Sequence, residues 1–122
     1  MFLWIGVSQS IFFAPRSFGE GASWFVQTDL ESKKIEFLLH EVEQLKGAKF
    51  WRNGTSYSPK QAADHLRMKW QKAGKVIKTA KDFIEKVASK SSMSGKPYEL
   101  EFENGTKVET RSFLFKKLGE WR

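Results

Sequence analysis

The residues best suited to chemistry lie in one polar segment, residues 88–97, with the sequence ASKSSMSGKP. Hydroxyl groups, lysine charges and a glycine that allows close backbone approach are the ingredients of a site for an anion. A carboxylate, a phosphate or a sulfated sugar would suit it, whereas the glycine spacing differs from that of a P-loop. The ligand-binding residues predicted in this segment are Lys90, Ser91, Ser92, Ser94, Gly95 and Lys96.

A second group of polar residues precedes this loop and is expected to join it. Its members are Arg52, Asn53, Tyr57, His65 and Arg67. The alternative is that Ser89, Ser91 and Ser92 bond the free carbonyl groups of the preceding helix, while Lys90 complements its dipole. Because polar loops usually satisfy their own backbone, both interpretations stand at this stage.

Nucleophilic catalysis would need His65 together with a loop serine and an acid. Asp64 is adjacent to His65, so on a helix the two side chains point about 100° apart and Asp64 is badly placed to orient the imidazole. No catalytic residue is therefore predicted, and a small hydrolase-like envelope enzyme using His65 with a loop serine is the alternative function.

Metal and cofactor sites have little support. Glu36, His40 and Glu43 share one helix face, but no second helix offers further ligands, so a solvated charged face is expected. The chain has no Cys and two His, which excludes a disulfide scaffold, a thiol nucleophile and a three-His site. We predict neither a metal nor a cofactor.

The charge balance favours acidic partners. Lys and Arg number 21 against 14 Asp and Glu, a net charge of +7, and Lys69, Lys72, Lys75 and Lys78 recur at every third position. No nucleic-acid motif accompanies them. We expect an anionic ligand or an envelope protein as partner, and no nucleic acid.

The first residues are typical of a targeting signal. Residues 1–14 are almost entirely apolar and too few to span a bilayer, which takes roughly 20 residues. Small residues cluster just after them, as a signal peptidase prefers, although no basic residue precedes the apolar run. The prediction is a signal peptide over residues 1–22 and a mature domain over 23–122 without a membrane span. The alternative is a buried amino-terminal element.

Three helices are predicted from capping boxes and helical spacing. The first helix is predicted to begin with the capping box of Thr28 and Glu31 and to end at Gly47, with a buried face of Ile35, Leu38, Leu39, Val42 and Leu45. The second is predicted to begin with Ser58, Pro59 and Gln61 and to end at Gly74, with a buried face of Ala62, Leu66, Trp70 and Ala73. The third is predicted to begin with Thr79 and Asp82 and to bury Phe83, Ile84 and Val87. Phe37 lies off the first stripe. An aromatic segment around Asn53-Gly54 is read as a short extended excursion.

A late hairpin completes the domain. Tyr98, Leu100 and Phe102 alternate with glutamates, and a three-residue turn with Gly105 left-handed would set Leu100 opposite Val108. Ser112 is expected to cap a last helix. The fold class predicted is α+β: three to four short helices packed against a C-terminal β-hairpin.

A family resemblance covers about residues 35–118. It is carried by Phe50, Arg52-Asn53-Gly54, Tyr57, Ala62-Ala63, His65-Leu66-Arg67, Lys69, Thr79-Ala80, Asp82-Phe83-Ile84, Ala88-Ser89, Ser91, Ser94-Gly95 and Pro97-Tyr98. These residues resemble the YfeK-like family, a domain of unknown function in small exported bacterial proteins. The resemblance implies export, with the periplasm as the compartment, and brings no catalytic residues. Together with the loop, it leads us to expect a non-enzymatic exported binding or interaction module.

Overall fold

The computed structural model describes residues 19–122, and side chains from residue 29 onward. The apolar leader, and with it the test of the signal-peptide prediction, therefore lies outside the described residues. The chain divides into two compact units, Met1–Leu30 and Glu31–Arg122. No helix of the described part is long and apolar enough to cross a membrane.

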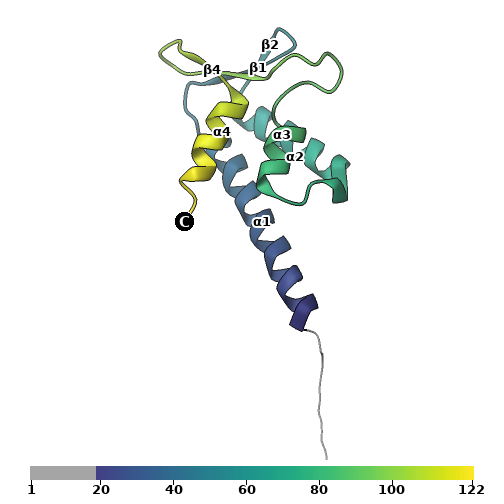
Figure 1. Ribbon diagram of the computed structural model, residues 1–122. Helices are drawn as coiled ribbons and strands as arrows, with labels where there is room; N and C mark the ends of the chain where they lie inside the picture. Colours follow the sequence, from purple (N-terminus) through teal and green to yellow (C-terminus); the bar gives the residue numbers. More distant parts are fainter. Residues whose placement is uncertain (1–18) are drawn as a thin grey trace, which may run out of the picture. The chain divides into compact units, whose positions relative to one another are not determined.

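The order of elements confirms the α+β class. They are α1 (Gly19–Glu43), β1 (Lys49–Arg52), β2 (Thr55–Tyr57), α2 (Pro59–Ala73), the 3₁₀ turn η2 (Gly74–Val76), α3 (Ala80–Lys86), β3 (Glu99–Glu101), β4 (Lys107–Glu109) and α4 (Thr110–Gly119). Figure 1 shows α2, α3 and α4 on one side of the strands, and within residues 31–122 no helix lies on the other side.

The four strands form one antiparallel sheet in the order β2-β1-β3-β4. The predicted register is confirmed, since Leu100 pairs with Val108 and Gly105 has a φ of 90°. The excursion around Asn53-Gly54 is a second hairpin, with φ values of 51° and 80° at its two turn residues, as a type I′ turn requires. The predicted hairpin is thus one half of a larger sheet, because Phe50 pairs with Leu100.

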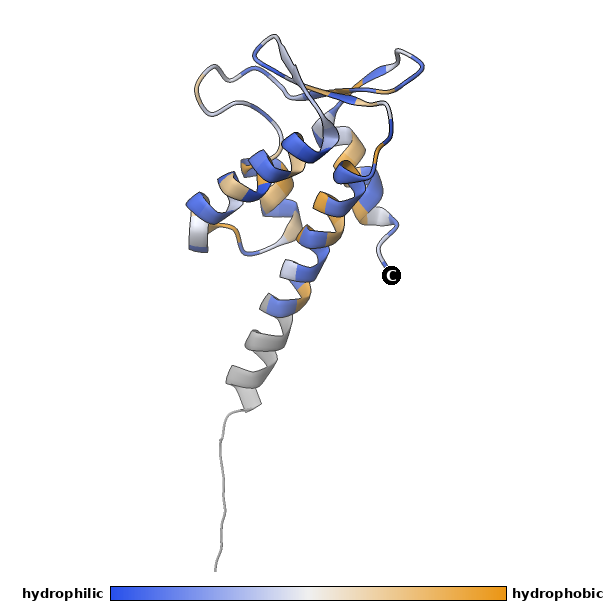
Figure 2. Cartoon of the chain, turned by 180° about the vertical axis from the view of Figure 1, so that it is seen from behind, coloured by the Kyte–Doolittle hydropathy of each residue, from blue (hydrophilic) through white to orange (hydrophobic). Residues whose placement is uncertain are grey.

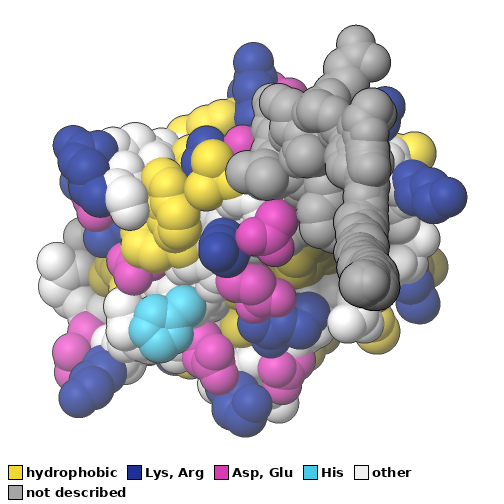
Figure 3. Space-filling view, turned by 90° about the horizontal axis from the view of Figure 1, so that it is seen from below, with side chains coloured by type: hydrophobic (Ala, Val, Ile, Leu, Met, Phe, Trp, Pro, Cys, Tyr) yellow, Lys and Arg dark blue, Asp and Glu magenta, His cyan; other side chains and the backbone are white. Residues whose placement is uncertain are grey.

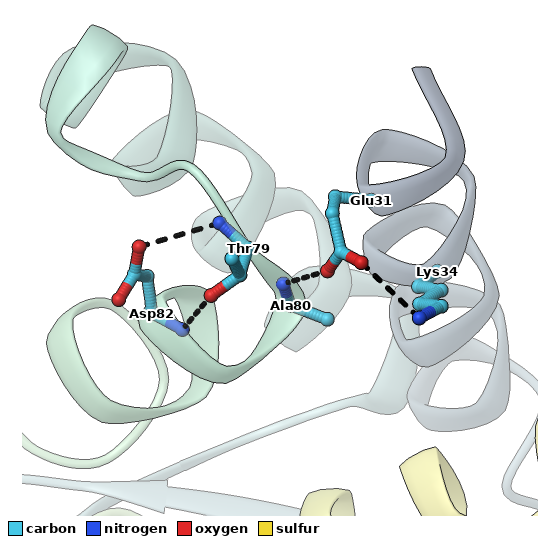
Figure 4. Close-up of polar contacts among 5 residues, drawn as sticks. All are labelled: Glu31, Lys34, Thr79, Ala80 and Asp82. Atoms are coloured by element: carbon cyan, nitrogen blue, oxygen red, sulfur yellow. Dashed lines mark hydrogen bonds and ion pairs between the residues drawn. The ribbon is translucent and has the colours of Figure 1, made fainter. Parts of the chain in front are cut away.

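Two helix starts differ from the predictions. Thr28 does not cap α1, because the helix already begins at Gly19. The Glu31 carboxylate instead accepts a hydrogen bond from the Ala80 amide at 2.8 Å and pairs with Lys34 at 3.1 Å (Figure 4). The last helix begins at Thr110, so Ser112 lies inside it rather than at its cap.

The other two capping boxes are confirmed. The Ser58 hydroxyl accepts from the Gln61 amide, and the Gln61 side chain accepts from the Ser58 amide. Thr79 and Asp82 make the same pair of bonds at the start of α3 (Figure 4). Gly74 ends α2 as predicted, whereas α1 ends at Glu43, before Gly47.

Gly47 has another role in the turn between α1 and β1. Its φ is +70°, and a Cβ atom there would lie 2.9 Å from the Glu103 side chain. The positive φ favours glycine here, and a larger residue would also have to displace the Glu103 side chain.

The core lies between the helices and the covered sheet face, and the apolar positions in Figure 2 alternate with hydrophilic ones along each helix. Of the predicted core, these side chains are buried: Ile35, Leu38, Leu39, Val42, Ala62, Leu66, Phe83, Ile84, Val87, Leu100 and Leu114. Leu45, Trp70 and Ala73 are only partly buried against it. Phe37 is covered by the carboxyl-terminal segment, because its ring packs edge-on against Trp121 at 5.4 Å.

Candidate functional site

The polar loop between α3 and β3 is closed by its own hydrogen bonds. Ser91 is buried, and its hydroxyl accepts from the Met93 amide at 3.3 Å and from the Ser94 amide at 3.4 Å. The Gly95 amide donates to the Ser91 carbonyl and the Lys96 amide to the Ser94 hydroxyl. Four successive backbone donors are therefore used within the loop and point away from any ligand.

The turn between β1 and β2 holds this loop from outside. Asn53 donates its amide to the Ser91 hydroxyl at 3.2 Å and accepts a hydrogen bond from the Ser94 hydroxyl. Ser89 takes the capping role considered for the serines, since its hydroxyl donates to the Ile84 carbonyl at 2.6 Å. Asn53, Ser91, Ser94 and the loop backbone thus form one rigid unit.

A second group of polar residues gathers around the hydroxyl of Tyr98. The Tyr98 ring is buried against Phe50, with ring centroids 5.0 Å apart. Its hydroxyl lies 2.9 Å from Lys69 Nζ and 3.3 Å from His65 Nε2. Lys69 also donates to the Lys90 carbonyl at 3.2 Å. His65 and Lys69 are one helical turn apart on α2, which places both side chains near Tyr98, the residue just before β3.

The end of the inner strand β1 adds a guanidinium to this group. Arg52 lies at the end of β1 and donates to the Tyr57 hydroxyl at 3.2 Å, with its guanidinium 5.6 Å from the centre of the Tyr57 ring. We call Arg52, His65, Lys69 and Tyr98 the basic cluster.

Burial and the closely spaced positive charges of the basic cluster shift the pKa values of His65, Lys69 and Tyr98. Burial, followed by the charges of Arg52, Lys69 and Lys72, lowers the pKa of His65 from its usual 6.5. Burial and the charge of Arg52 also lower the pKa of Lys69. Burial raises the pKa of the Tyr98 hydroxyl, and Arg52 opposes that rise. Each shift disfavours the charged form of its group, as expected where charge is desolvated without a counter-ion.

The hydrogen-bond directions follow from these charges. Lys69 carries only donors, so the Tyr98 oxygen must accept from it. The Tyr98 proton is then free to be donated, and the Nε2 of a neutral His65 is the acceptor within reach. We therefore expect a directed chain from Lys69 through Tyr98 to His65, in which the Nε2 of His65 carries no proton.

No carboxylate neutralises the cluster in the described part of the chain. Arg52, Lys69 and Lys72 form no ion pair there, whereas other basic residues on the helices do. Arg67 is the nearest contrast: it lies two residues before Lys69, yet it pairs with Glu36 at 2.7 Å, a bond that raises the pKa of Arg67. Figure 3 shows basic and acidic side chains intermixed on the face seen from below.

The structure therefore sorts the predicted site residues into groups. The polar loop and the turn that holds it contain Asn53, Ser91, Ser94, Gly95 and Lys96. The basic cluster contains Arg52 and His65, and Arg52 contacts Tyr57. The Lys90 carbonyl connects the loop to the cluster through Lys69, Ser92 is exposed on the loop, and Arg67 pairs with Glu36 on α1. Lys69 and Tyr98 were missed as site residues. Two features of the sequence could have indicated them. His65 and Lys69 are four residues apart on one helix, and the hydroxyl of a buried tyrosine such as Tyr98 usually has a hydrogen-bond partner.

Two chemistries considered above can be compared with this geometry. His65 Nε2 is bonded to Tyr98, and within residues 29–122 no hydrogen bond joins it to Ser91, Ser92 or Ser94. Over the same residues no group of three or more His, Asp or Glu side chains is placed to hold a metal. On the face considered for a metal, Glu36 pairs with Arg67 and Glu43 with Lys60.

Comparison with known proteins agrees with the resemblance found in the sequence. The model of a family of unknown function, DUF5329, matches residues 29–122. The protein named "Uncharacterized protein YfeK" from Salmonella typhimurium (strain LT2) is 43% identical over 68 residues, which cover 56% of this chain and 57% of that protein. The match thus spans little more than half the length of this relative. No solved structure matches.

Proposed function

Because this chain belongs to DUF5329, a family of unknown function, we propose a function from its site: a non-enzymatic module that binds an anionic group at the basic cluster. One observation carries the proposal. Arg52 at the end of β1 and Lys69 on α2 each donate to a tyrosine hydroxyl, Arg52 to Tyr57 and Lys69 to Tyr98. Both charges act on His65, and in the described residues neither has a carboxylate partner.

Electrostatic energy supplies the reason to bind. Like charges held together in a partly desolvated site raise each other's free energy, and an anion between them relieves this repulsion. The guanidinium of Arg52 can present two parallel donors to a carboxylate, phosphate or sulfate, and Lys69 supplies a point charge. Lys72 and the exposed Lys90 add long-range attraction at the rim.

Titration with inorganic sulfate tests the cluster directly. Backbone and imidazole NMR shifts would be followed for the wild type and for Lys69→Gln and Arg52→Gln, with Lys81→Gln, an exposed charge on α3, as the matched control. Loss of one charged partner is expected to weaken sulfate binding about 3- to 10-fold, and the control to leave it unchanged. Sulfate is also expected to raise the pKa of His65, because an anion stabilises the imidazolium.

The loop lysines provide a second comparison. Lys90→Ala with Lys96→Ala removes two exposed charges and should leave thermal stability nearly unchanged while weakening binding by a smaller factor than Lys69→Gln. Equal affinity in the wild type, Lys69→Gln and Lys81→Gln would refute the cluster. A loss confined to the Lys90/Lys96 variant would place the anion at the loop instead.

We propose further that the module acts after export, in the periplasm. The apolar leader of residues 1–14, the small residues after it and the YfeK-like resemblance support this. Sequencing the amino terminus of the protein recovered from the native envelope fraction tests it. A new terminus at Glu20 or at Ser23 is expected, and an intact Met1 on protein found in the cytosolic fraction would refute export.

A further inference from the structure

The uncovered face of the sheet carries a shallow pocket of about 390 Å³, within the range of ligand sites. Its lining comes from β1, the β1–β2 turn, the end of the polar loop, β3 and β4: Trp51, Asn53, Gly54, Lys96, Glu99 and Lys107, beside Pro97. Trp51 and Arg52 are consecutive on one strand, so their side chains leave the sheet on opposite faces. The pocket is therefore separate from the basic cluster.

Trp51 provides a fixed aromatic surface in this pocket. It lies opposite Glu99 in the β1–β3 ladder, and its indole Nε1 donates to the Glu101 carboxylate at 2.9 Å. Lys107 places its ammonium 4.9 Å from the centre of the ring. The indole is thus anchored by its polar edge, and the Lys107 ammonium lies over one face of its ring.

The polar groups around the ring are also held in position. Asn53 is fixed by Ser91 and Ser94, so the amide at the pocket edge does not have to be ordered by a ligand. Glu99 and Lys96 form no ion pair in the described residues, which leaves an acceptor and a donor facing one space. Pro97 restricts the backbone at the rim of the pocket. Gly54 leaves the rim open, since no atom lies within 4 Å of where its Cβ would be.

From this lining we infer a binding site for an acidic sugar residue of a glycan chain. A sugar ring has an apolar C–H face that stacks on an indole, and hydroxyl groups at its edge that donate to a carboxylate and accept from an amide or ammonium. The lining itself holds the ammonium groups of Lys96 and Lys107 and the carboxylate of Glu99, while the Glu101 carboxylate lies outside the lining, bonded to the indole Nε1. A carboxylate or sulfate on the sugar can pair with either lysine, and this contact favours such a sugar over a neutral one.

Lys107 links stacking to charge selection. A cation over an exposed aromatic ring contributes only about 0.5–1 kcal/mol, so a sugar ring can displace the ammonium from the indole. The displaced ammonium then lies at the rim, where the anionic substituent of the sugar would be. Replacing Lys107 should consequently reduce the preference for acidic sugars more than it reduces binding of neutral ones.

The test compares α-1,4-digalacturonate with its neutral counterpart α-1,4-galactobiose by NMR titration at low ionic strength. Both should shift the Trp51 indole N–H signal and the amides of Asn53, Gly54 and Lys96, with digalacturonate binding about 3- to 10-fold more tightly. Trp51→Ala should abolish both responses, whereas Trp121→Ala, at an indole that packs on Phe37 outside the sheet, should leave them intact.

Lys107→Gln serves as the second variant, since an exposed lysine can be replaced without disturbing the fold, and it should bring the two affinities within about twofold. Absence of any shift with either disaccharide overturns the inference, as does an unchanged response in Trp51→Ala. Equal shifts with sodium acetate would show that the pocket binds anions without reading the sugar, which also overturns it. Lys69→Gln separates the two sites: it should weaken sulfate binding and leave digalacturonate binding unchanged.

Discussion

Removing the Tyr98 hydroxyl tests the directed hydrogen-bond chain of the basic cluster. Tyr98→Phe deletes one oxygen from a buried ring and leaves its packing on Phe50 unchanged. Lys69 then keeps only the Lys90 carbonyl as a hydrogen-bond partner, and His65 loses the donor to its Nε2.

The cost to stability can be bounded from these bonds. A hydrogen bond to a charged group contributes about 1.5–3 kcal/mol. Because Lys69 retains a second acceptor and removal of the hydroxyl leaves less polar surface to desolvate, we expect a loss of roughly 1–2 kcal/mol in the free energy of unfolding. Urea denaturation at pH 8 measures it. Tyr57→Phe, the only other tyrosine substitution that the chain allows, is the matched control; its hydroxyl is half-buried, so a loss below about 1 kcal/mol is expected.

The pKa of His65 gives the more decisive result, because the sign of its change reports the direction of the bond. If Tyr98 donates to His65, the bond stabilises the neutral imidazole, and its loss in Tyr98→Phe raises the pKa of His65 toward 6.5. If His65 donates instead, the bond stabilises the imidazolium most, and its loss lowers the pKa further. NMR titration measures the change, and His40→Asn removes the one other imidazole signal.

The same pKa links pH to stability. Since the folded protein lowers the pKa of His65, the unfolded chain binds more protons as pH falls through 6.5 toward the folded value. Stability contributed by this residue is therefore complete above pH 6.5 and decreases over that window. In Tyr98→Phe the window should become narrower. A lower His65 pKa in the variant, or a wider window, would refute the chain from Lys69 through Tyr98 to His65.

Two further substitutions test how the helices are held. Leu66→Ala should lower the free energy of unfolding by roughly 2–5 kcal/mol, because Leu66 is fully buried. Met68→Ala, at an exposed position of the same helix, is the control and should cost less than about 0.5 kcal/mol. Thermal or urea melts that show a loss below about 0.5 kcal/mol for Leu66→Ala would contradict the packing of Leu66. Glu31→Ala should lower the free energy of unfolding by about 1.5–3 kcal/mol, since it removes the hydrogen bond from the Ala80 amide to a charged carboxylate. Lys34→Met breaks only the ion pair and should cost at most about 1 kcal/mol. Equal losses in the two variants would show that the hydrogen bond to Ala80 does not stabilise the fold.

The sequence predicted correctly those parts of the fold that depend on interactions between residues a few positions apart. The capping boxes at Ser58 and Thr79 and the three-residue turn at Gly105 depend on residues within a few positions of one another. The capping box at Thr28 failed for the opposite reason. Glu31 finds its partner at Ala80, 49 residues away, and no spacing rule within one helix reports that contact.

The sheet and the site show the same limit. The Asn53-Gly54 turn was visible in the sequence, but the pairing of Phe50 with Leu100 joins two hairpins across 50 residues. That pairing brings Tyr98 beside α2 and so creates the basic cluster. Lys69 looked like one member of a lysine run, and only the position of the Tyr98 hydroxyl distinguishes it from Lys75 or Lys78.

The distribution of ion pairs explains why the cluster is best understood as a binding site. The fold has carboxylates available near α2, since Glu36 pairs with Arg67 and both Glu43 and Asp64 lie near Lys60. A single carboxylate beside Lys69 would remove the repulsion with Arg52, and a structural role alone gives no reason for its absence. Local rules of stability are usually violated at functional sites, where the uncompensated charge is what a ligand recognises. On this argument we propose that Arg52 and Lys69 have no carboxylate partner within residues 29–122 because an anionic ligand takes that place.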